Sequence, residues 1–344
     1  MAGTGGFGSY YTALLFLGMN WGLIGYGEIA PCFIEGLLAV EGQELHGIAS
    51  RTRHQELAVR NTYPAVKIYS NYSDLLNDPD IDVIYVCTIN NLHKQNVLDA
   101  LRAGKNVLSE KPLGVCKSDV EEMIFEARSQ NKFLMEGMWT RFLPAYRHFK
   151  RLLDDGVVGR ISFAQIDFGF LSEWGPERRL RNKALYGGTL LDNADYGIFL
   201  SQEIFRIPPV RISTFARFCE TGVEDMCGVM LQYPNGAISQ LFSSFQLKTR
   251  QEAVVYGEKG YFQLKPFWNG TVIAVHTLAE GTKSSEFPFR KNGFEYEIEE
   301  VAKCVMNQQI QSEIVPHQLS IEIAGILDEI ITKTKVSNEK GPTH

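Results

Sequence analysis

Small residues near the N-terminus form the first pattern that could bind a ligand. Gly25, Gly27 and Ala30 make up G-x-G-x-x-A, directly after a short apolar run at 21–24 and before an amphipathic segment of helix length. In a dinucleotide-binding unit the first glycine turns the chain off a strand, the second lets the backbone approach a pyrophosphate, and the alanine lets the helix pack closely. The diphosphate would lie on the free N–H groups of that helix. A glycine turn without a ligand is the alternative, because such turns occur in any α/β protein.

A second group of candidate ligand-binding residues follows the next predicted strand, 44–50. In a dinucleotide fold the end of this strand faces the adenosine ribose, where an acidic side chain would accept from the 2′-hydroxyl and repel a 2′-phosphate. Ser50, Arg51 and Arg53 offer donors and positive charge there instead. The pattern favours NADP over NAD, and the alternative is the start of a solvated basic helix.

Two further strand ends carry polar side chains. The apolar run at 82–87 is typical of a strand buried on both faces, and the segment 88–93, Thr-Ile-Asn-Asn-Leu-His, follows it. The predicted strand at 106–109 leads directly into the segment 110–112, Glu-Lys-Pro. Ligands bind beyond the carboxyl ends of the strands in open parallel sheets, so both segments are candidates for a binding site.

Length, charge and cysteine usage limit the classes of function. The 344 residues exceed one ordinary core and predict two domains, and the composition is that of a soluble globular protein. A formal net charge of −6 leaves no excess of Lys and Arg to neutralise the phosphates of a nucleic acid. The six cysteines form no C-x-x-C pair, so we expect free thiols in the cytoplasm, with neither a disulfide framework nor a metal site.

The order of predicted elements indicates an α/β fold with a second domain. Strands alternate with helices as far as about residue 143, which predicts a Rossmann-type, doubly wound parallel sheet. Beyond it, β-rich segments are joined by turn signals such as Pro234-Asn235-Gly236, which predicts an α+β domain with a large, mostly antiparallel sheet. The expected division is an extension at 1–18 outside the fold, a dinucleotide-binding domain at 19–143, a substrate and oligomerisation domain at 144–336, and a tail at 337–344. The apolar part of the extension is too short to span a membrane.

Several motifs in fixed order resemble the glucose–fructose oxidoreductase and inositol dehydrogenase family (Gfo/Idh/MocA). They are the glycine pattern, the 88–93 segment, Glu-Lys-Pro at 110–112 and Gly-Gly-Thr-Leu-Leu-Asp at 187–192. The resemblance runs from about residue 19 to 336. The segment 135–142, Met-Glu-Gly-Met-Trp-Thr-Arg-Phe, followed by Pro144, is similar to the branch that holds dimeric dihydrodiol dehydrogenases and NADP-linked D-xylose dehydrogenases.

The resemblance implies hydride transfer between NAD(P) and a sugar or cyclic polyol. Lys111 matches the family's catalytic lysine, Pro112 its frequent cis-proline, and Asp192 and Tyr196 its D-x-x-x-[HY] pair, in which the last residue is the acid/base. The cofactor contacts that we expect, combining the patterns with the resemblance, are Gly25, Gly27, Glu28, Ile29, Ala30, Ser50, Arg51, Arg53, Thr88, Asn90, Asn91, His93, Glu110, Lys111 and Pro112.

The chemistry explains why these residue types are needed. Oxidation of a carbinol removes a hydride and a proton, so a base must accept the hydroxyl proton. Tyrosine, with an ordinary pKa of about 10, is a poor base at neutral pH, but a nearby ammonium such as Lys111 favours the phenolate. Asp192 could orient the reacting hydroxyl or balance the lysine. The alternative for Tyr196 is a packed aromatic at a domain interface.

The substrate contacts that we expect are His93, Trp139, Arg141, Phe142 and Phe168. Trp139, Arg141 and Phe142 could belong to the core or to a pocket wall, and we favour Trp139 and Phe142 as an apolar wall against a ring. His93 could contact the substrate or the nicotinamide, or could be a hydrogen-bonded structural histidine.

Two departures from the family pattern affect the substrate side. Ala194 stands where the family usually has glycine between the aspartate and the acid/base, and Asp195 adds a carboxylate beside Tyr196. Asn90 stands where the dihydrodiol branch can carry histidine.

The sequence therefore predicts an NADP-dependent oxidoreductase acting on a ring hydroxyl of an aldopyranose or a trans-dihydrodiol. A keto-sugar reductase and a non-catalytic NADP(H) sensor are the alternatives. We expect a homodimer formed through the C-terminal sheet.

Overall fold

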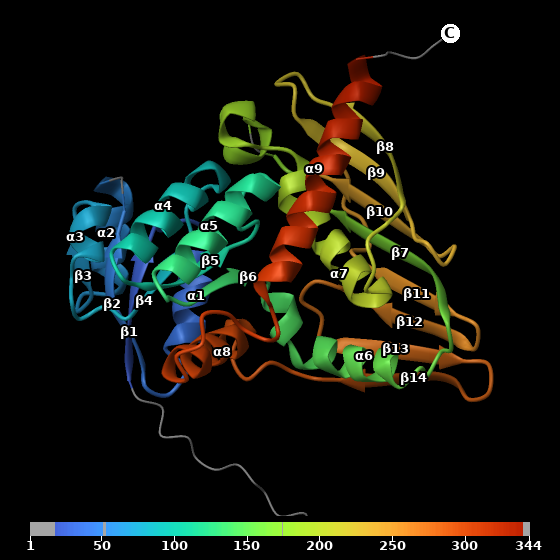
Figure 1. Cartoon of the computed structure of the whole chain (residues 1–344), viewed down its shortest axis with the longest axis horizontal. Coiled ribbons are helices and arrows are strands. Elements are labelled where there is room, and N and C mark those ends of the chain that lie inside the picture. Colours follow the sequence, from blue (N-terminus) through green and yellow to red (C-terminus); the bar gives the residue numbers. More distant parts are fainter. Residues whose placement is uncertain (1–17, 51–52, 174, 340–344) are drawn as a thin grey trace, which may run out of the picture.

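The computed structural model describes residues 18–50, 53–173 and 175–339, apart from the side chains of residues 53–55 and 337–339. It contains two β-sheets with helices between them (Figure 1). The expected extension at 1–18 therefore lies almost wholly outside the described residues. Within the described part of the chain, no helix combines the length and the apolar character needed to cross a membrane.

The first sheet has six parallel strands in the order β3-β2-β1-β4-β5-β6. The strands are β1 (Met19–Ile24), β2 (Gln43–Ala49), β3 (Lys67–Tyr69), β4 (Val83–Val86), β5 (Asn106–Glu110) and β6 (Leu134–Gly137). The connecting helices are α1 (Ala30–Leu37), α2 (Arg53–Thr62), α3 (Tyr72–Leu76), α4 (Asn90–Arg102) and α5 (Lys117–Ser129). This confirms the predicted doubly wound parallel sheet.

Side chains point alternately to the two faces of this sheet, and each face packs into its own hydrophobic core. Trp21, Leu23 and Tyr85 lie in the cluster that contains Phe33 of α1, whereas Ile24 and its neighbours in the sheet pack with α4 and α5 on the other face. The chain winds to one side from β1 to β3 and to the other from β4 to β6, so the direction reverses between β1 and β4. In sheets of this topology, ligands bind at such a reversal, beyond the carboxyl ends of the two strands.

The second sheet has eight strands in the order β14-β13-β12-β11-β7-β10-β9-β8. They are β7 (Ile161–Gly169), β8 (Arg211–Phe218), β9 (Glu224–Gln232), β10 (Ile238–Ser244), β11 (Ala253–Gly257), β12 (Gly260–Leu264), β13 (Val272–Thr277) and β14 (Gly281–Glu286). All neighbouring pairs are antiparallel except β7 with β10, which confirms a mostly antiparallel sheet. Strands β13 and β14 were not predicted from the sequence. These strands form the edge of the sheet, where β14 is polar and largely exposed and so gives little apolar alternation.

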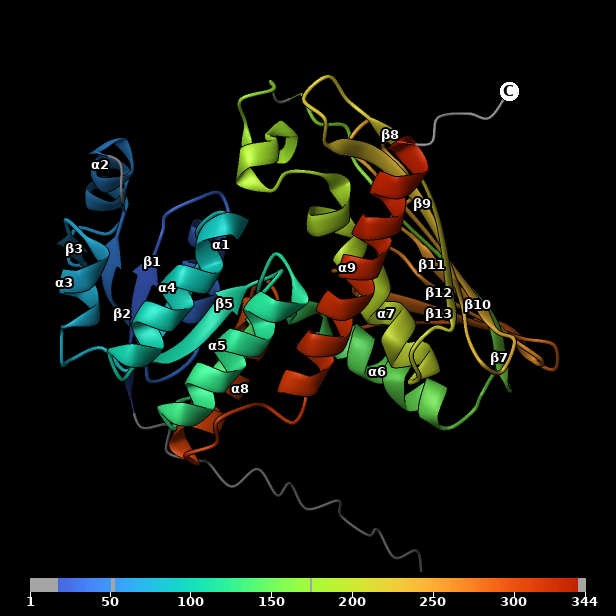
Figure 2. The same ribbon diagram turned by 45° about the horizontal axis from the view of Figure 1, so that its top comes forward.

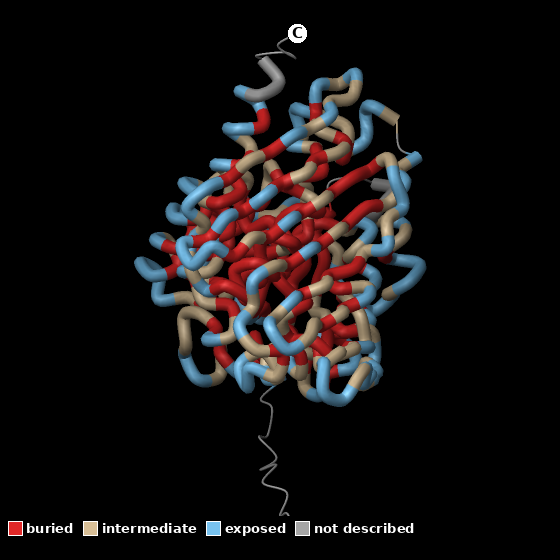
Figure 3. Tube along the Cα trace, turned by 90° about the vertical axis from the view of Figure 1, so that its right-hand side faces the viewer, coloured by how far each residue is buried: buried red, intermediate tan, exposed pale blue. Residues whose placement is uncertain are grey.

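Helices cover one face of the second sheet and leave the other open. The covering helices are α6 (Pro144–Asp154), α7 (Asp195–Phe205) and α9 (His317–Glu339), which lie between the two sheets in Figure 1. Figure 3 views the molecule from the opposite side of this sheet, where exposed and buried positions alternate along the strands.

The two C-terminal helices contact both halves of the molecule. Helix α8 (Phe294–Met306) packs against α1, and α9 lies against α5 and β8 (Figure 2). Phe294 contacts Phe33 of α1 with ring centroids 5.8 Å apart and stacks on Trp139 at 4.7 Å. The part of the chain expected to form the second domain therefore also completes the core of the first sheet.

Truncation of Phe294 tests this connection. Phe294 is 4% exposed, so Phe294→Ala should lower the free energy of unfolding by about 3–5 kcal/mol, because a buried aromatic is lost between two rings. Phe125→Ala, on α5 and 70% exposed, is the matched control and should change it by less than about 0.5 kcal/mol. Chemical denaturation followed by tryptophan fluorescence measures both. Equal effects of the two substitutions would contradict the role given to Phe294.

Candidate active site

The glycine turn at the end of β1 has the geometry of a nucleotide-binding turn. Gly25 has a φ of 101°, and a Cβ built there would lie 2.9 Å from the carbonyl oxygen of Cys87, so a larger residue does not fit. A Cβ on Gly27 would meet only that same oxygen, at 3.9 Å, and Gly27 is exposed. Helix α1 begins at Ala30 with no acidic residue in its first turn. The open second glycine and the uncharged helix start fit a dinucleotide diphosphate.

The residues expected to contact the adenosine ribose are only partly described. Ser50 is buried at the end of β2. Arg51 lies outside the described residues, and Arg53 opens α2 with its side chain also outside them.

A lysine from the first sheet meets a tyrosine from the second half of the chain. Lys111 follows β5, and its peptide bond to Pro112 is cis, as the resemblance implies. Its Nζ lies 4.4 Å from the centroid of the Tyr196 ring and donates to the backbone carbonyl of Asp192 at 2.5 Å. The Oδ2 atom of Asp195 lies 3.7 Å from the same Nζ. The lysine and the tyrosine therefore face the same space.

Burial and neighbouring charges together set the pKa values of Lys111 and Tyr196. Burial opposes the charge on Lys111, but Asp195, Tyr196 and Asp192 together outweigh that effect and raise the pKa of the lysine above its ordinary value. Burial also raises the pKa of Tyr196 above that of an ordinary tyrosine, and Lys111 offsets only part of this increase. Lys111 thus acts on the tyrosine in the direction expected from the sequence, but desolvation is larger and the pKa of Tyr196 rises.

Aromatic side chains surround the tyrosine. Its hydroxyl accepts a hydrogen bond from Trp139 Nε1 at 3.2 Å. Phe168 lies 5.7 Å from the Tyr196 ring, and Trp268 lies 6.1 Å from it while stacking on Phe168. Trp268 was not predicted, because nothing near it in the sequence connects it with the other site residues.

Asp192 lies beside the lysine, but its carboxylate has another partner. Its Oδ1 accepts from Arg179 Nη1 at 2.6 Å. Asp192 belongs to a π-helical turn, Leu190–Ala194, that leads directly into α7, and such turns are frequent at functional sites. Arg179 was also missed, because it lies in an irregular segment after β7.

The same irregular segment reaches back to the glycine turn. Arg178 Nη2 lies 3.5 Å from Glu28 Oε1, and both side chains are exposed. A contact between the 178–192 region and the glycine turn therefore joins one half of the molecule to the other.

The segment after β4 forms the floor of this region. His93 is fully buried, with Nδ1 at 2.8 Å from the carbonyl of Pro112 and Nε2 at 3.0 Å from that of Thr88. These contacts favour the structural alternative for His93, which links the lysine's strand end to the end of β4. Asn90 is buried in the first turn of α4, and Asn91 has a buried Oδ1 without a hydrogen-bond partner among the described residues. An orphaned acceptor at this strand end fits a bound ligand.

Glu110 points toward the core of the first sheet. Its carboxylate accepts a hydrogen bond from the Tyr85 hydroxyl, and burial raises the pKa of Glu110.

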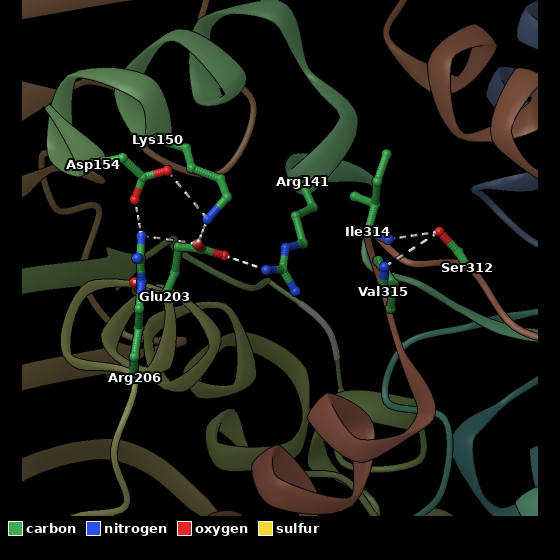
Figure 4. A network of polar contacts seen from close by, with 8 residues as sticks. All are labelled: Arg141, Lys150, Asp154, Glu203, Arg206, Ser312, Ile314 and Val315. Atoms are coloured by element: carbon green, nitrogen blue, oxygen red, sulfur yellow. Dashed lines mark hydrogen bonds and ion pairs between the residues drawn. The ribbon is translucent and has the colours of Figure 1, made fainter.

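Arg141 and Phe142 lie apart from the lysine and the tyrosine. Arg141 Nη2 is 2.5 Å from Glu203, which also pairs with Lys150, in the ion-pair network of Figure 4. Glu203 lies seven residues beyond Tyr196, about 10 Å along α7. Phe142 lines a separate cavity of about 160 Å³ beside α8. Of the five expected substrate residues, Trp139 and Phe168 alone contact the Tyr196 side chain.

Fold and site together define a nucleotide-dependent oxidoreductase: a Rossmann sheet with a glycine turn, and a lysine and tyrosine facing the same space. A family model described as "Oxidoreductase family, NAD-binding Rossmann fold" matches residues 19–138, and one described as "GFO/IDH/MocA C-terminal domain" matches residues 146–263. The chain belongs to the Gfo/Idh/MocA family of NAD(P)-binding oxidoreductases.

Relatives within the family are similar over nearly the whole chain. A trans-1,2-dihydrobenzene-1,2-diol dehydrogenase of Mus musculus is 35% identical over 328 residues, which cover 91% of this chain and 96% of the relative. The enzyme of that name from Homo sapiens is 33% identical over 330 residues, with the same coverage.

Solved structures share the fold. An aldose-aldose oxidoreductase of Caulobacter crescentus has a TM-score of 0.83 at 24% identity, covering 93% of this chain and 98% of its own. A 3-ketoreductase of Actinomadura kijaniata, solved with NADP and TDP-benzene, has a TM-score of 0.83 at 23% identity, covering 92% of this chain and 98% of its own.

The contacts of Arg141 predict that its substitution lowers the stability of the fold without changing the affinity for substrate. Arg141→Met removes one ion-pair partner of Glu203, whose side chain is 2% exposed, so the free energy of unfolding should fall by about 3 kcal/mol although Lys150 and Arg206 still lie near it. The KM for substrate should stay within about twofold of the wild-type value, because the guanidinium pairs with Glu203, about 10 Å along α7 from Tyr196. Denaturation and steady-state kinetics on the folded variant measure the two effects. A large rise in KM at unchanged stability would restore a substrate role for Arg141.

Proposed function

We propose that this chain transfers a hydride between NADP and a ring carbon of an aldopyranose or a trans-dihydrodiol. The observation that carries the proposal is the approach of Lys111 Nζ to the Tyr196 ring at 4.4 Å, beyond the carboxyl end of β5. The cofactor would lie beyond the carboxyl ends of β1 and β4, held through the glycine turn and the segment 88–93. The nicotinamide, when bound, supplies or accepts the hydride.

Tyr196 is the proton donor or acceptor in this proposal. Its hydroxyl is held by the indole N–H of Trp139, which orients the phenol without taking its proton. Lys111 stabilises negative charge on the tyrosine when the proton leaves. The carboxylate of Asp192, fixed by Arg179, would orient the hydroxyl groups of the substrate.

The aromatic wall points to a ring-shaped substrate. Trp139, Phe168 and Trp268 surround the tyrosine, and their faces suit the C–H surface of a sugar or the apolar face of a cyclic diol. The relatives named as dihydrodiol dehydrogenases favour the diol. Sugar oxidation and keto-sugar reduction use the same groups and remain the second candidate.

The preference for NADP rests on residues near the end of β2. Ser50, Arg51 and Arg53 include no acidic residue that would repel a 2′-phosphate. We further propose that residues 19–143 bind the cofactor, that residues 144–336 shape the substrate site, and that the enzyme works in the cytoplasm, where its six free cysteines stay reduced.

A non-catalytic sensor is the weaker alternative. A protein that only reads NADP(H) needs neither a lysine nor an acid/base, yet this chain has both and brings them together.

Substitution of the two central residues tests the proposed reaction. Lys111→Met and Tyr196→Phe should each reduce turnover by about 10²–10⁴-fold, because each removes a group that stabilises or transfers the proton. Both variants should still bind NADP, measured by quenching of tryptophan fluorescence. Turnover is followed by nicotinamide absorbance, with NADP or NAD offered against dihydrodiols, aldopentoses, aldohexoses and inositols. Near-normal turnover by either variant would refute the assigned roles.

We also propose that the chain forms a homodimer through the outer face of the second sheet. Phe163, Tyr256, Tyr261 and His276 form a ladder of ring contacts across β7, β11, β12 and β13, with centroids 4.9–5.8 Å apart. Phe215 on β8 is 79% exposed, while its neighbour Thr214 turns inward to bond Thr334 of α9. An aromatic surface on an open sheet is typical of a subunit interface.

Charge introduced on this face should separate the subunits. Phe215→Asp is expected to raise the dimer dissociation constant by at least about tenfold, because an unpaired charge would be buried between the sheets. Phe125→Asp, at an exposed phenylalanine of the first sheet's α5, is the control. Light scattering over a dilution series measures the mass. A wild-type chain that is monomeric at all concentrations would rule out the dimer.

A further inference from the structure

A buried carboxylate adjoins the lysine and the tyrosine, and the proposed reaction has not yet used it. Asp195 is the first residue of α7 and is 1% exposed. Its Oδ1 accepts a hydrogen bond from the backbone N–H of Tyr196 at 2.8 Å. Its Oδ2 lies 3.7 Å from Lys111 Nζ and has no hydrogen-bond partner among the described residues.

The other aspartate near the lysine is already balanced. The carboxylate of Asp192 pairs with Arg179 at 2.6 Å, and only its backbone carbonyl reaches Lys111. The carboxylate that faces the ammonium is therefore that of Asp195, which the sequence analysis noted only as a departure.

We propose that Asp195 is the counter-ion of Lys111 and, together with burial, keeps Tyr196 in its phenol form, so that the site can donate a proton to a bound carbonyl. This inference rests on the proposed function and concerns its proton-donating half, the reduction of a ring ketone; the reverse reaction releases a proton and is favoured at higher pH.

The groups around the tyrosine support this role for Asp195. Charged and titratable side chains surround the Lys111–Tyr196–Asp195 cluster. They come from the end of β5 (Glu110, Lys111), from β6 (Glu136), from η2 (Arg179–Arg181), from η4 (Leu190–Ala194, which contains Asp192) and from α7 (Asp195). Burial lowers the pKa of His93, with smaller contributions from Arg179 and Lys111, which favours its neutral form.

Asp195 is a carboxylate of this group whose charge changes near neutral pH. Burial raises the pKa of Glu110 and of Glu136, which favours their neutral forms, and Asp192 is neutralised by Arg179. Burial likewise raises the pKa of Asp195, to about 7. Above that pH Asp195 is ionised, and its charge opposes the removal of a proton from Tyr196.

The reductive step balances with the groups named. A reduced nicotinamide held at the glycine turn would supply the hydride, whose two electrons form the new C–H bond while the C–O π pair moves to the oxygen. That oxygen takes the proton of the Tyr196 hydroxyl, which leaves a phenolate beside the Lys111 ammonium. Water then returns a proton to the phenolate. The carbonyl is reduced to an alcohol, and the nicotinamide is oxidised.

Removal of the Asp195 charge without loss of its hydrogen bond tests the proposal. In Asp195→Asn the amide oxygen can still accept from the N–H of Tyr196, and Asp195→Glu keeps the charge. Asp99→Asn removes one carboxylate from the exposed face of α4 and is the matched control. Circular dichroism establishes that each variant is folded.

Two readouts are followed against pH. The first is the ionisation of Tyr196 in protein without cofactor, from ¹³Cζ-tyrosine NMR assigned with Tyr196→Phe. Asp195→Asn should lower the titration midpoint by about one pH unit or more, since an opposing charge is gone, whereas Asp195→Glu should restore most of the shift. The second is the rate in both directions: in Asp195→Asn the rise of oxidation and the fall of reduction should move to lower pH by the same amount.

The possible outcomes test the counter-ion role of Asp195 and the proposed hydride transfer separately. A Tyr196 midpoint in Asp195→Asn equal to that of the wild type and of Asp99→Asn would overturn the counter-ion role, even in an active enzyme. Rate profiles of Asp195→Asn that do not move to lower pH relative to the wild type and Asp99→Asn would likewise overturn that role. Absence of hydride transfer with every substrate and cofactor would instead refute the proposed function, while the NMR titration would still test the counter-ion.

Discussion

The burial of the Lys111 ammonium is the constraint on which the site depends. A charged amine removed from water is costly unless it is paired and hydrogen-bonded. Lys111 meets this requirement with groups from the second half of the chain: the carbonyl of Asp192, the carboxylate of Asp195 and the ring face of Tyr196. The position of β5 relative to α7 is therefore fixed by the same contacts that set the ionisation of the tyrosine. Displacement of the two halves would leave a buried cation without partners.

A chain of aromatic contacts supports this arrangement from the other side. Phe33, on the helix that follows the glycine turn, contacts Phe294 of α8, which stacks on Trp139. Trp139 donates to the hydroxyl of Tyr196. The helix at which a diphosphate would bind is thus connected through three packed rings to the phenol that we propose as the proton donor or acceptor. Close packing of this kind transmits small displacements, so the helix and the tyrosine keep their spacing.

Local sequence patterns predicted most helices and strands, whereas the site residues that were missed are placed by long-range contacts. The parallel sheet followed from apolar runs and glycine turns, and the close approach of Lys111 and Tyr196 agrees with the roles that the family resemblance gave them. Neither periodicity nor a motif marks Arg179 or Trp268 in the sequence, and only the folded chain brings Arg179 to Asp192 and Trp268 to the tyrosine. Arg141 was expected near the substrate because it follows β6, yet its side chain turns to Glu203, a partner 62 positions away that sequence spacing does not reveal.

The departures from the family pattern have a common structural consequence. With Ala194 in place of glycine, the chain passes through a π-helical turn, Leu190–Ala194, before α7 begins. Asp195 follows directly as the first residue of α7, so it lies inside one continuous helical run. The backbone N–H of Tyr196 donates to Oδ1 and leaves Oδ2 on the side of the lysine. The carboxylate charge that opposes ionisation of the neighbouring phenol is thus positioned by the local backbone, so the backbone and the protonation state of the site are determined together.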